Sequence, residues 1–261
     1  MSSSDTPVAL ITNAHTYVGA PLARVLARSG HRFVLHVPRA GRDTALHSDD
    51  GVDRLASELG SQGCDSVVVR DHDLSTAEGN AACVDAALSR FSRLDAACLV
   101  TGTIAVGSFL KVNPDTWDTM KRFNLDMVFH GLQAVLPPML AAGRGQVVVF
   151  TSATGARPEP RTSVYAATRA GANALVRAVG LEHAASGVTV NAIGTNFMDF
   201  PGFRDASGMD DPERASKVIA QVPMRRLGSL DELAEFTAVL LDGRSRFQTG
   251  QFFSYSGGWS T

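Results

Sequence analysis

A serine, a tyrosine and an arginine are spaced so that they could carry out acid–base chemistry on an oxygen atom. Ser152 follows an apolar run at 147–150, Tyr165 lies thirteen residues further on, and Arg169 follows one helical turn later. Residues four apart share one face of a helix, so a helix here brings Arg169 beside Tyr165. A neighbouring cation favours the phenolate form of a tyrosine. The trio predicts Tyr165 as general base, Ser152 as the holder of a substrate oxygen, and Arg169 as the group that tunes the base.

The composition is typical of a globular α/β protein. The chain has 261 residues, of which 44% are apolar and 19% charged, which suits a single domain spanning residues 1–261. A net charge of −2 gives no indication of a nucleic-acid partner. The chain has no apolar run of about 18 residues and no signal-peptide pattern, so we expect neither membrane insertion nor export. Cys64, Cys83 and Cys98 lack metal-ligand spacing, and they indicate reduced, buried thiols of a cytoplasmic protein with no metal site.

Apolar runs alternate with amphipathic helical patterns along the chain. The runs that predict strands lie at 8–11, 32–37, 66–69, 94–100, 147–150, 188–193 and 251–255. The helical patterns begin at Gly19 and recur near 52–60, 77–90, 115–141, 165–185, 212–221 and 230–242. This alternation predicts a single-domain Rossmann-like α/β fold, with a doubly wound, mainly parallel sheet of seven strands. Pro137 and Pro138 are expected to kink or end the long helix, and the stretch after the sixth strand is expected to be irregular.

The spacing of Ser152, Tyr165 and Arg169 resembles the Ser–Tyr–Lys centre of the short-chain dehydrogenase/reductases, and the resemblance extends over nearly the whole chain. Those enzymes carry lysine where this chain has Arg169. Folds of this kind bind dinucleotides at the carboxyl ends of their strands, where glycines in the first strand–helix turn let the backbone approach the pyrophosphate. The resemblance therefore directs attention to that turn.

The first turn departs from the glycine pattern. Asn13 and Tyr17 stand where the first two glycines of the reductases would be, and only Gly19 remains. Asparagine tolerates the left-handed backbone of a tight turn, but the Tyr17 ring is predicted to fill space that a dinucleotide needs. Arg39 and Arg42, just after the second strand, instead favour dinucleotide binding, because an arginine in this region can accommodate the 2′-phosphate of NADP.

A second family shares these departures. The chain contains S-x12-Y-x3-R at Ser152, Tyr165 and Arg169, and T-x4-[FY]-x-G across residues 12–19. The two motifs together resemble the halohydrin dehalogenases, relatives of the reductases that use no nicotinamide. This resemblance implies that no cofactor is needed, that vicinal haloalcohols are converted to epoxides with release of halide, and that epoxides are opened by small anions such as azide, cyanide or nitrite. It also implies a homotetramer whose main contact uses the helix at 115–141 and the Tyr165 helix.

The released halide needs a site of its own. The reductases carry Pro-Gly directly after the sixth strand, whereas this chain continues into Asn196, Phe197 and Met198. Backbone N–H groups of this segment, walled by Tyr17, are predicted to hold the halide or the attacking anion in a water-poor pocket. The expected partners are therefore a small haloalcohol or epoxide and small anions, with no nucleic acid and no membrane.

Two other interpretations remain open. The chain has 21 arginines and three lysines, so Arg169 could be a drifted lysine of an atypical NADP-dependent carbonyl reductase, which NADPH binding would favour. Alternatively, the protein is a non-catalytic sensor built on a reductase fold. Failure to release halide or to open epoxides would favour that alternative.

Overall fold

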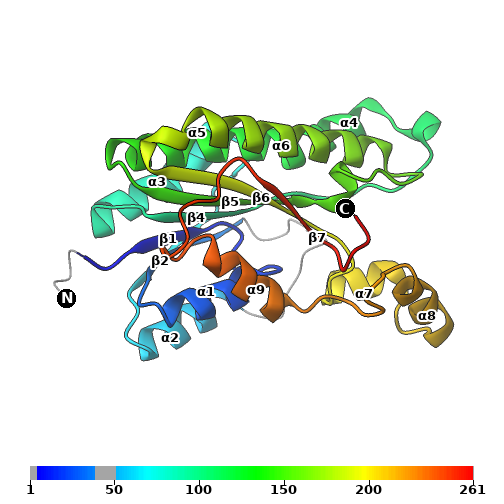
Figure 1. Ribbon diagram of the computed structural model, residues 1–261, viewed down its shortest axis with the longest axis horizontal. Coiled ribbons are helices and arrows are strands. Elements are labelled where there is room, and N and C mark those ends of the chain that lie inside the picture. Colours follow the sequence, from blue (N-terminus) through cyan, green and yellow to red (C-terminus); the bar gives the residue numbers. More distant parts are fainter. Residues whose placement is uncertain (1–4, 39–50, 261) are drawn as a thin grey trace.

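The computed structural model describes residues 5–38 and 51–260, which form a seven-stranded sheet with helices on both faces (Figure 1). The strand order is β3-β2-β1-β4-β5-β6-β7, and every neighbouring pair is parallel. The strands are β1 (Val8–Ile11), β2 (Arg32–Val37), β3 (Ser66–Arg70), β4 (Ala96–Val100), β5 (Gly145–Ser152), β6 (Val188–Thr195) and β7 (Phe252–Tyr255). The predicted Rossmann-like, doubly wound parallel sheet is confirmed.

Helices cover the sheet in two layers (Figure 1). One layer contains α1 (Gly19–Ala27), α2 (Val52–Ser61) and α9 (Leu230–Val239). The other contains α3 (Ala77–Phe91), α4 (Pro114–Lys121), α5 (Met127–Ala141) and α6 (Ser163–Glu182). Two further helices, α7 (Pro201–Ser207) and α8 (Pro212–Ala220), lie together beyond the carboxyl ends of the strands. Short 3-10 turns lie at Phe109–Lys111, Ala153–Gly155 and Ala184–Ser186, and a π turn lies at Arg122–Asp126.

The central strands are buried on both faces because each face packs against its own helical layer. In β5, Val148 and Phe150 belong to the core on the α1 side, whereas Val147 and Val149 belong to the core on the α6 side. The strand order reverses between β1 and β4, and ligands of such sheets bind at this switch point, outside the carboxyl ends of the strands. The fold thus locates the crevice to which Ser152, at the end of β5, contributes.

The long helix does not break at its prolines as the sequence suggests. α4 and α5 are joined by the π turn, and α5 continues through Pro137 and Pro138 to Ala141. The predicted end at the prolines is therefore wrong, whereas the alternative of a kink stays a prediction. Val135 and Met139 are buried on either side of the prolines, so packing against the core keeps these last turns helical.

The stretch after β6 is more regular than expected. α7 begins with Pro201 in its first turn and is followed by Gly208, which has a left-handed backbone with φ of 64°. Proline at a helix start and glycine just past its end are common boundary signals. The expectation of an irregular stretch is wrong over α7, and these two residues carry the signal that could have revealed the helix.

Further sequence expectations concern the cysteines, membrane-spanning helices, metal ligands and the arginines after the second strand. Cys64, Cys83 and Cys98 are all buried free thiols. Within residues 5–38 and 51–260, no helix is long and apolar enough to cross a membrane. The same residues contain no cluster of three or more His, Cys, Asp or Glu side chains that could hold a metal ion. Arg39 and Arg42, the residues that could accommodate an NADP phosphate, lie outside the described residues.

Candidate active site

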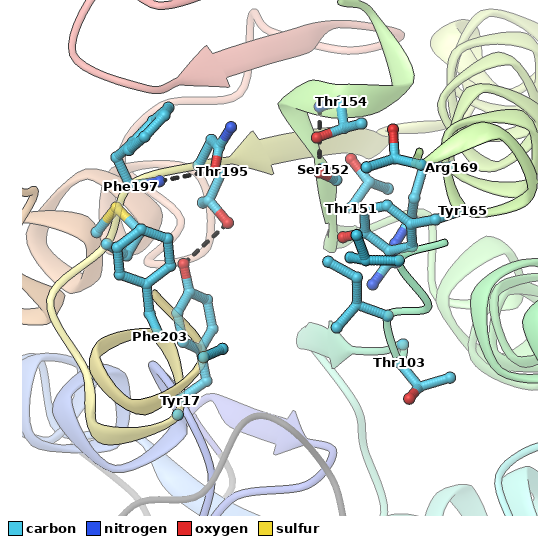
Figure 2. A pocket seen from close by; sticks show the side chains of 18 of the residues that line it. Tyr17, Thr103, Thr151, Ser152, Thr154, Tyr165, Arg169, Thr195, Phe197 and Phe203 are labelled. Atoms are coloured by element: carbon cyan, nitrogen blue, oxygen red, sulfur yellow. Dashed lines mark hydrogen bonds between the residues drawn. The ribbon is translucent and has the colours of Figure 1, made fainter. Parts of the chain in front are cut away.

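A cavity of about 490 Å³ lies at the carboxyl ends of β4, β5 and β6 (Figure 2). All seven site residues singled out from the sequence line it: Tyr17, Ser152, Tyr165, Arg169, Asn196, Phe197 and Met198. Figure 2 shows two facing walls, with the predicted acid–base trio on one side and Tyr17, Thr195 and Phe197 on the other. The residues predicted for proton transfer therefore face those predicted for anion binding across one open space.

Ser152 ends β5 with its hydroxyl group oriented by the following turn. Its Oγ accepts a hydrogen bond from the backbone N–H of Thr154 at 3.1 Å. Because Oγ is the acceptor in that contact, the hydroxyl hydrogen of Ser152 remains available to a substrate. Gly155 lets this turn approach α6 closely, since a Cβ there would lie 2.8 Å from the backbone nitrogen of Ala170. The backbone thus fixes the Ser152 hydroxyl group at the end of β5.

Tyr165 lies in the first turn of α6, where it is half-buried and lines the cavity. In the described part of the chain no residue forms a hydrogen bond with its hydroxyl group. The guanidinium carbon of Arg169 lies over its ring, 5.4 Å from the ring centroid. The helical spacing therefore brings the two side chains together as expected, but the cation sits over the ring face instead of bonding to the hydroxyl group.

Arg169 is held by the end of β4. Its Nη1 donates to Thr101 Oγ1 at 3.1 Å and its Nη2 donates to the Thr101 carbonyl at 2.8 Å. A longer contact of 3.4 Å joins Nη1 to the Phe150 carbonyl. Among the residues that the structure describes, no carboxylate pairs with this buried guanidinium, and its Nε has no hydrogen-bond partner. A buried cation with only neutral partners is costly, so the site favours negative charge in the adjoining cavity.

Gly102 provides the space that the guanidinium occupies. Its backbone has φ of +115°, and a Cβ there would overlap Nη2 of Arg169. Asn124, in the π turn, holds Thr103, the residue after Gly102. Its Oδ1 accepts from the Thr103 N–H at 3.1 Å and its Nδ2 donates to the Thr103 carbonyl at 3.0 Å. These contacts make the loop after β4 a rigid holder for Arg169.

Tyr17 crosses the opposite wall of the cavity. Its backbone is left-handed, with φ of 51°, and its hydroxyl group donates to Thr195 Oγ1 at 2.9 Å. Its ring meets Phe150 and Phe200 edge-on, at centroid distances of 5.9 and 5.1 Å. Burial raises the pKa of Tyr17 well above its usual range, so this phenol stays protonated and acts as a donor.

The residues of the first turn do not fit a dinucleotide. The Asn13 N–H donates to His36 Nδ1 at 3.2 Å, and the Ala14 N–H donates to the His36 carbonyl at 2.9 Å, so these amides are already used. The Tyr17 side chain, bonded to Thr195, spans the crevice from this turn to the end of β6. A pyrophosphate needs backbone amides and close approach to the turn, but the Asn13 and Ala14 amides are taken and the Tyr17 side chain occupies the approach.

His36 holds the first turn through the Asn13 and Ala14 amides, and the sequence analysis does not single it out. Besides its bond from Asn13, its Nε2 lies 3.0 Å from the His72 carbonyl, which can only accept a hydrogen bond. The hydrogen therefore sits on Nε2 and the ring is neutral. Burial lowers the pKa of His36 to about 4. A histidine within an apolar strand is the only sequence signal that could have identified it.

The segment predicted to hold the halide has two of its amides engaged. The Phe197 N–H donates to Oδ1 of Asn196 at 2.9 Å, and the Asn196 N–H donates to the Tyr255 carbonyl at 3.4 Å. Phe197 has a left-handed backbone with φ of 55°, and its ring lies edge-on to Trp259 at 5.7 Å. An anion bound at the Phe197 amide would therefore have to displace the Asn196 side chain.

Thr101 and Thr195 take part in the site although the sequence analysis gives neither of them a role. Thr101 directly follows β4 and Thr195 ends β6, so both occupy carboxyl ends of strands that flank the switch point. Ligands bind at such positions in open α/β sheets. Their place at the strand ends is therefore the signal that could have identified them.

Comparison with known proteins shows similarity over nearly the whole chain. Residues 16–260 match a family model described as enoyl-(acyl carrier protein) reductase. Oxidoreductase UcpA of Escherichia coli (strain K12) is 31% identical over 249 residues, which cover 93% of this chain and 90% of the relative. The 3-oxoacyl-[acyl-carrier-protein] reductase FabG of Staphylococcus aureus (strain Mu50) is 26% identical over 253 residues, which cover 97% of this chain and 98% of the relative.

Proposed function

Because the chain belongs to the short-chain dehydrogenase/reductase family, we propose that it is a member in which proton transfer has been kept and hydride transfer lost: a halohydrin dehalogenase. Such a lyase converts vicinal haloalcohols to epoxides with release of halide, and opens epoxides with azide, cyanide or nitrite. One observation carries the proposal. The Tyr17 side chain, bonded to Thr195 at 2.9 Å, fills the crevice where this fold holds a dinucleotide, while Ser152 and Tyr165 keep their places beside it.

Ring closure requires a base but no hydride acceptor. In the proposed mechanism the phenolate of Tyr165 takes the alcohol proton while the Ser152 hydroxyl group donates to the same oxygen. That oxygen forms a bond to the adjacent carbon, and the carbon–halogen bond breaks with its electron pair leaving on the halide. A positioned base contributes roughly 10²–10⁴-fold in rate. Ring opening is the reverse, with Tyr165 returning the proton to the epoxide oxygen.

Arg169 supplies fixed positive charge during this cycle. It lies over the Tyr165 ring and has no carboxylate partner in the described residues, so it is free to balance a phenolate. An arginine suits this role because it stays charged at all working pH values. The halide would lie at the opposite wall, between Tyr17 and the Asn196–Met198 segment. That wall also carries the Phe197 ring, which packs edge-on against Trp259 and makes the wall partly apolar.

The names of the relatives favour a second candidate. UcpA is named an oxidoreductase and FabG a reductase, and both align with nearly the whole chain. By that analogy the protein would be a carbonyl reductase that uses NADP, with Arg169 in place of the usual lysine. This candidate requires a dinucleotide to bind where Tyr17 lies and where the Asn13 and Ala14 amides are already engaged. The site geometry therefore favours the dehalogenase.

A paired measurement separates the candidates. Halide release from a panel of vicinal haloalcohols is expected without any added cofactor, and calorimetric titration with NADH and NADPH is expected to show no binding. Micromolar binding of either nucleotide, together with carbonyl reduction, would establish the reductase instead. A protein inert in both assays would be the non-catalytic sensor.

We further propose that the protein assembles as a homotetramer through the faces of α5 and α6. Phe129 on α5 is 46% exposed, and α6 presents the exposed small residues Ala167, Ala170, Ala174 and Ala178 at helical spacing. Small residues on one face allow close approach of a second helix, and an exposed phenylalanine beside them is suited to burial in an interface. Light scattering after gel filtration measures the assembly, and a monomer in solution would rule the proposal out.

A further inference from the structure

A hydroxyl group at the end of β6 has a hydrogen to spare. Thr195 ends β6 and lines the cavity. Its Oγ1 accepts a hydrogen bond from the Tyr17 hydroxyl group at 2.9 Å (Figure 2). A threonine hydroxyl group carries one hydrogen in addition to its acceptor lone pairs, and no described residue accepts that hydrogen. Thr195 can therefore donate to a ligand in the cavity.

Tyr17 fixes Thr195 as the acceptor in one hydrogen bond, which leaves Thr195 to act as the donor in the next. Its phenol is buried and bonded through its own hydrogen, so Thr195 must act as the acceptor in their contact. A hydroxyl group that accepts one hydrogen bond becomes a better donor in the next, because the bonds polarise one another. The edge-on contacts of the Tyr17 ring with Phe150 and Phe200 hold this arrangement in place.

Thr195 is also the neighbour of Ser152 across the sheet. The two residues are paired in register at the ends of β5 and β6, and adjacent strands lie about 4.8 Å apart. Ser152 accepts from the Thr154 N–H just as Thr195 accepts from Tyr17, so each has its own hydrogen left. A vicinal haloalcohol carries its oxygen and its halogen on adjacent carbons. Two hydroxyl donors on neighbouring strands therefore match the two groups of such a substrate.

Two of the nearby amides are less available than this hydroxyl group. The Phe197 N–H is taken by the Asn196 side chain and the Asn196 N–H by the Tyr255 carbonyl. An anion at these amides has to break an existing hydrogen bond. An anion at Thr195 breaks none, so its gain is not offset by a lost contact.

We propose that Thr195 is the hydrogen-bond donor that holds the leaving halide and, in the reverse direction, the entering azide or cyanide. This assignment rests on the proposed function, because it deepens the description of the same site. Negative charge develops on the halogen as the carbon–halogen bond breaks. A hydrogen-bond donor that is already in position stabilises such developing charge most effectively. Losing one hydrogen bond to a charged group weakens binding by roughly 10- to 100-fold.

Bromide binding tests the assignment directly and without turnover. Crystals of the wild-type protein soaked in bromide are expected to show an anomalous peak within hydrogen-bonding distance of Thr195 Oγ1. Thr195→Val, which keeps the shape but removes the hydroxyl group, should lose the peak, and Thr195→Ser should restore it. Thr103→Val makes the same chemical change elsewhere on the cavity wall, where only the backbone of Thr103 is hydrogen-bonded, and should leave the peak intact.

Affinity in solution gives the second readout. Trp259 packs on Phe197, so its fluorescence reports bromide in the cavity once the exposed Trp117 is replaced by phenylalanine. In that background Thr195→Val is expected to weaken bromide binding roughly tenfold or more. An unchanged affinity in Thr195→Val, or a bromide peak away from Thr195, would overturn the assignment. Halide release from haloalcohols is measured separately. If the wild-type protein releases halide but binds bromide away from Thr195, only this inference is refuted. If it releases no halide, the proposed function is refuted.

Discussion

Replacing Gly102 with alanine tests how Arg169 is held. The new Cβ would overlap Nη2 of the guanidinium, so the arginine must leave both the carbonyl and the hydroxyl group of Thr101. A hydrogen bond to a charged group contributes about 1.5–3 kcal/mol, so losing two costs about 3 kcal/mol or more. The left-handed backbone at φ +115° adds about 1 kcal/mol for a residue that carries a Cβ. We therefore expect the free energy of unfolding to fall by about 4 kcal/mol.

The assay combines denaturant unfolding with halide release. Gly107→Ala is the matched control, because Gly107 lies in the same loop, has no atom within 4 Å of a built Cβ and needs no left-handed backbone. The control should stay within about 0.5 kcal/mol of the wild type. Gly102→Ala should also lose most halide release, because the cation no longer lies over the Tyr165 ring.

A double-mutant cycle isolates the part of the clash that involves Arg169, because the new Cβ would also lie 2.6 Å from Asn124 Oδ1. Lysine has no Nη2, so Gly102→Ala should destabilise an Arg169→Lys background far less than it destabilises the wild type. A coupling free energy of about 2 kcal/mol or more is expected from the hydrogen bonds at stake. If Gly102→Ala were as stable and active as Gly107→Ala, or if the cycle showed no coupling, the described position of Arg169 would be refuted.

The other predictions concern protonation and the base. Between pH 6.5 and about 4, His36 is protonated in the unfolded chain but stays neutral in the folded chain. The unfolded state therefore binds more protons, and the free energy of unfolding falls as pH falls, by up to about 3 kcal/mol. Denaturant titrations across that range should show a shallower slope for His36→Gln, and an unchanged slope would contradict the assignment. Tyr165→Phe should keep the wild-type unfolding curve yet lose ring closure and ring opening by roughly 10²–10⁴-fold, and turnover near wild type would mean that the base lies elsewhere. Under the proposed function, Arg169→Lys should still release halide, with an activity that declines at high pH because lysine loses its charge there, and NADPH-dependent carbonyl reduction by this variant would argue for the reductase.

The parts of the site that are local in sequence could be predicted from it. Tyr165 and Arg169 share a helix face through their spacing alone, and Ser152 precedes them at the end of a strongly apolar strand. The departure at Tyr17 was equally visible, because a single position in a strand–helix turn decides whether glycine is present. The order of strands and helices followed from the alternation of apolar and amphipathic segments.

The long-range contacts could not be predicted in the same way. Tyr17 and Thr195 are 178 residues apart, and Thr101 and Arg169 are 68 apart. Such pairs depend on which strands become neighbours and in which register, and local periodicity does not encode either. The same limitation explains Pro137, where burial of the flanking residues overrides the local tendency of proline to end a helix.

The two halves of the cavity differ in how they treat charge, and this difference supports the proposed chemistry. On one wall Arg169 is a buried cation with no carboxylate partner in the described residues, so that wall favours an anion beside it. On the other wall Thr195, which accepts the hydrogen bond of Tyr17, offers a neutral hydroxyl donor that can hold a halide without trapping it as a full counter-charge would. In the proposed reaction, ring closure moves negative charge from the substrate oxygen, beside Tyr165, to the halide on the opposite wall. A site with strong fixed charge at the start of that path and weak donors at its end lets the halide depart, and it equally admits azide or cyanide for the reverse reaction.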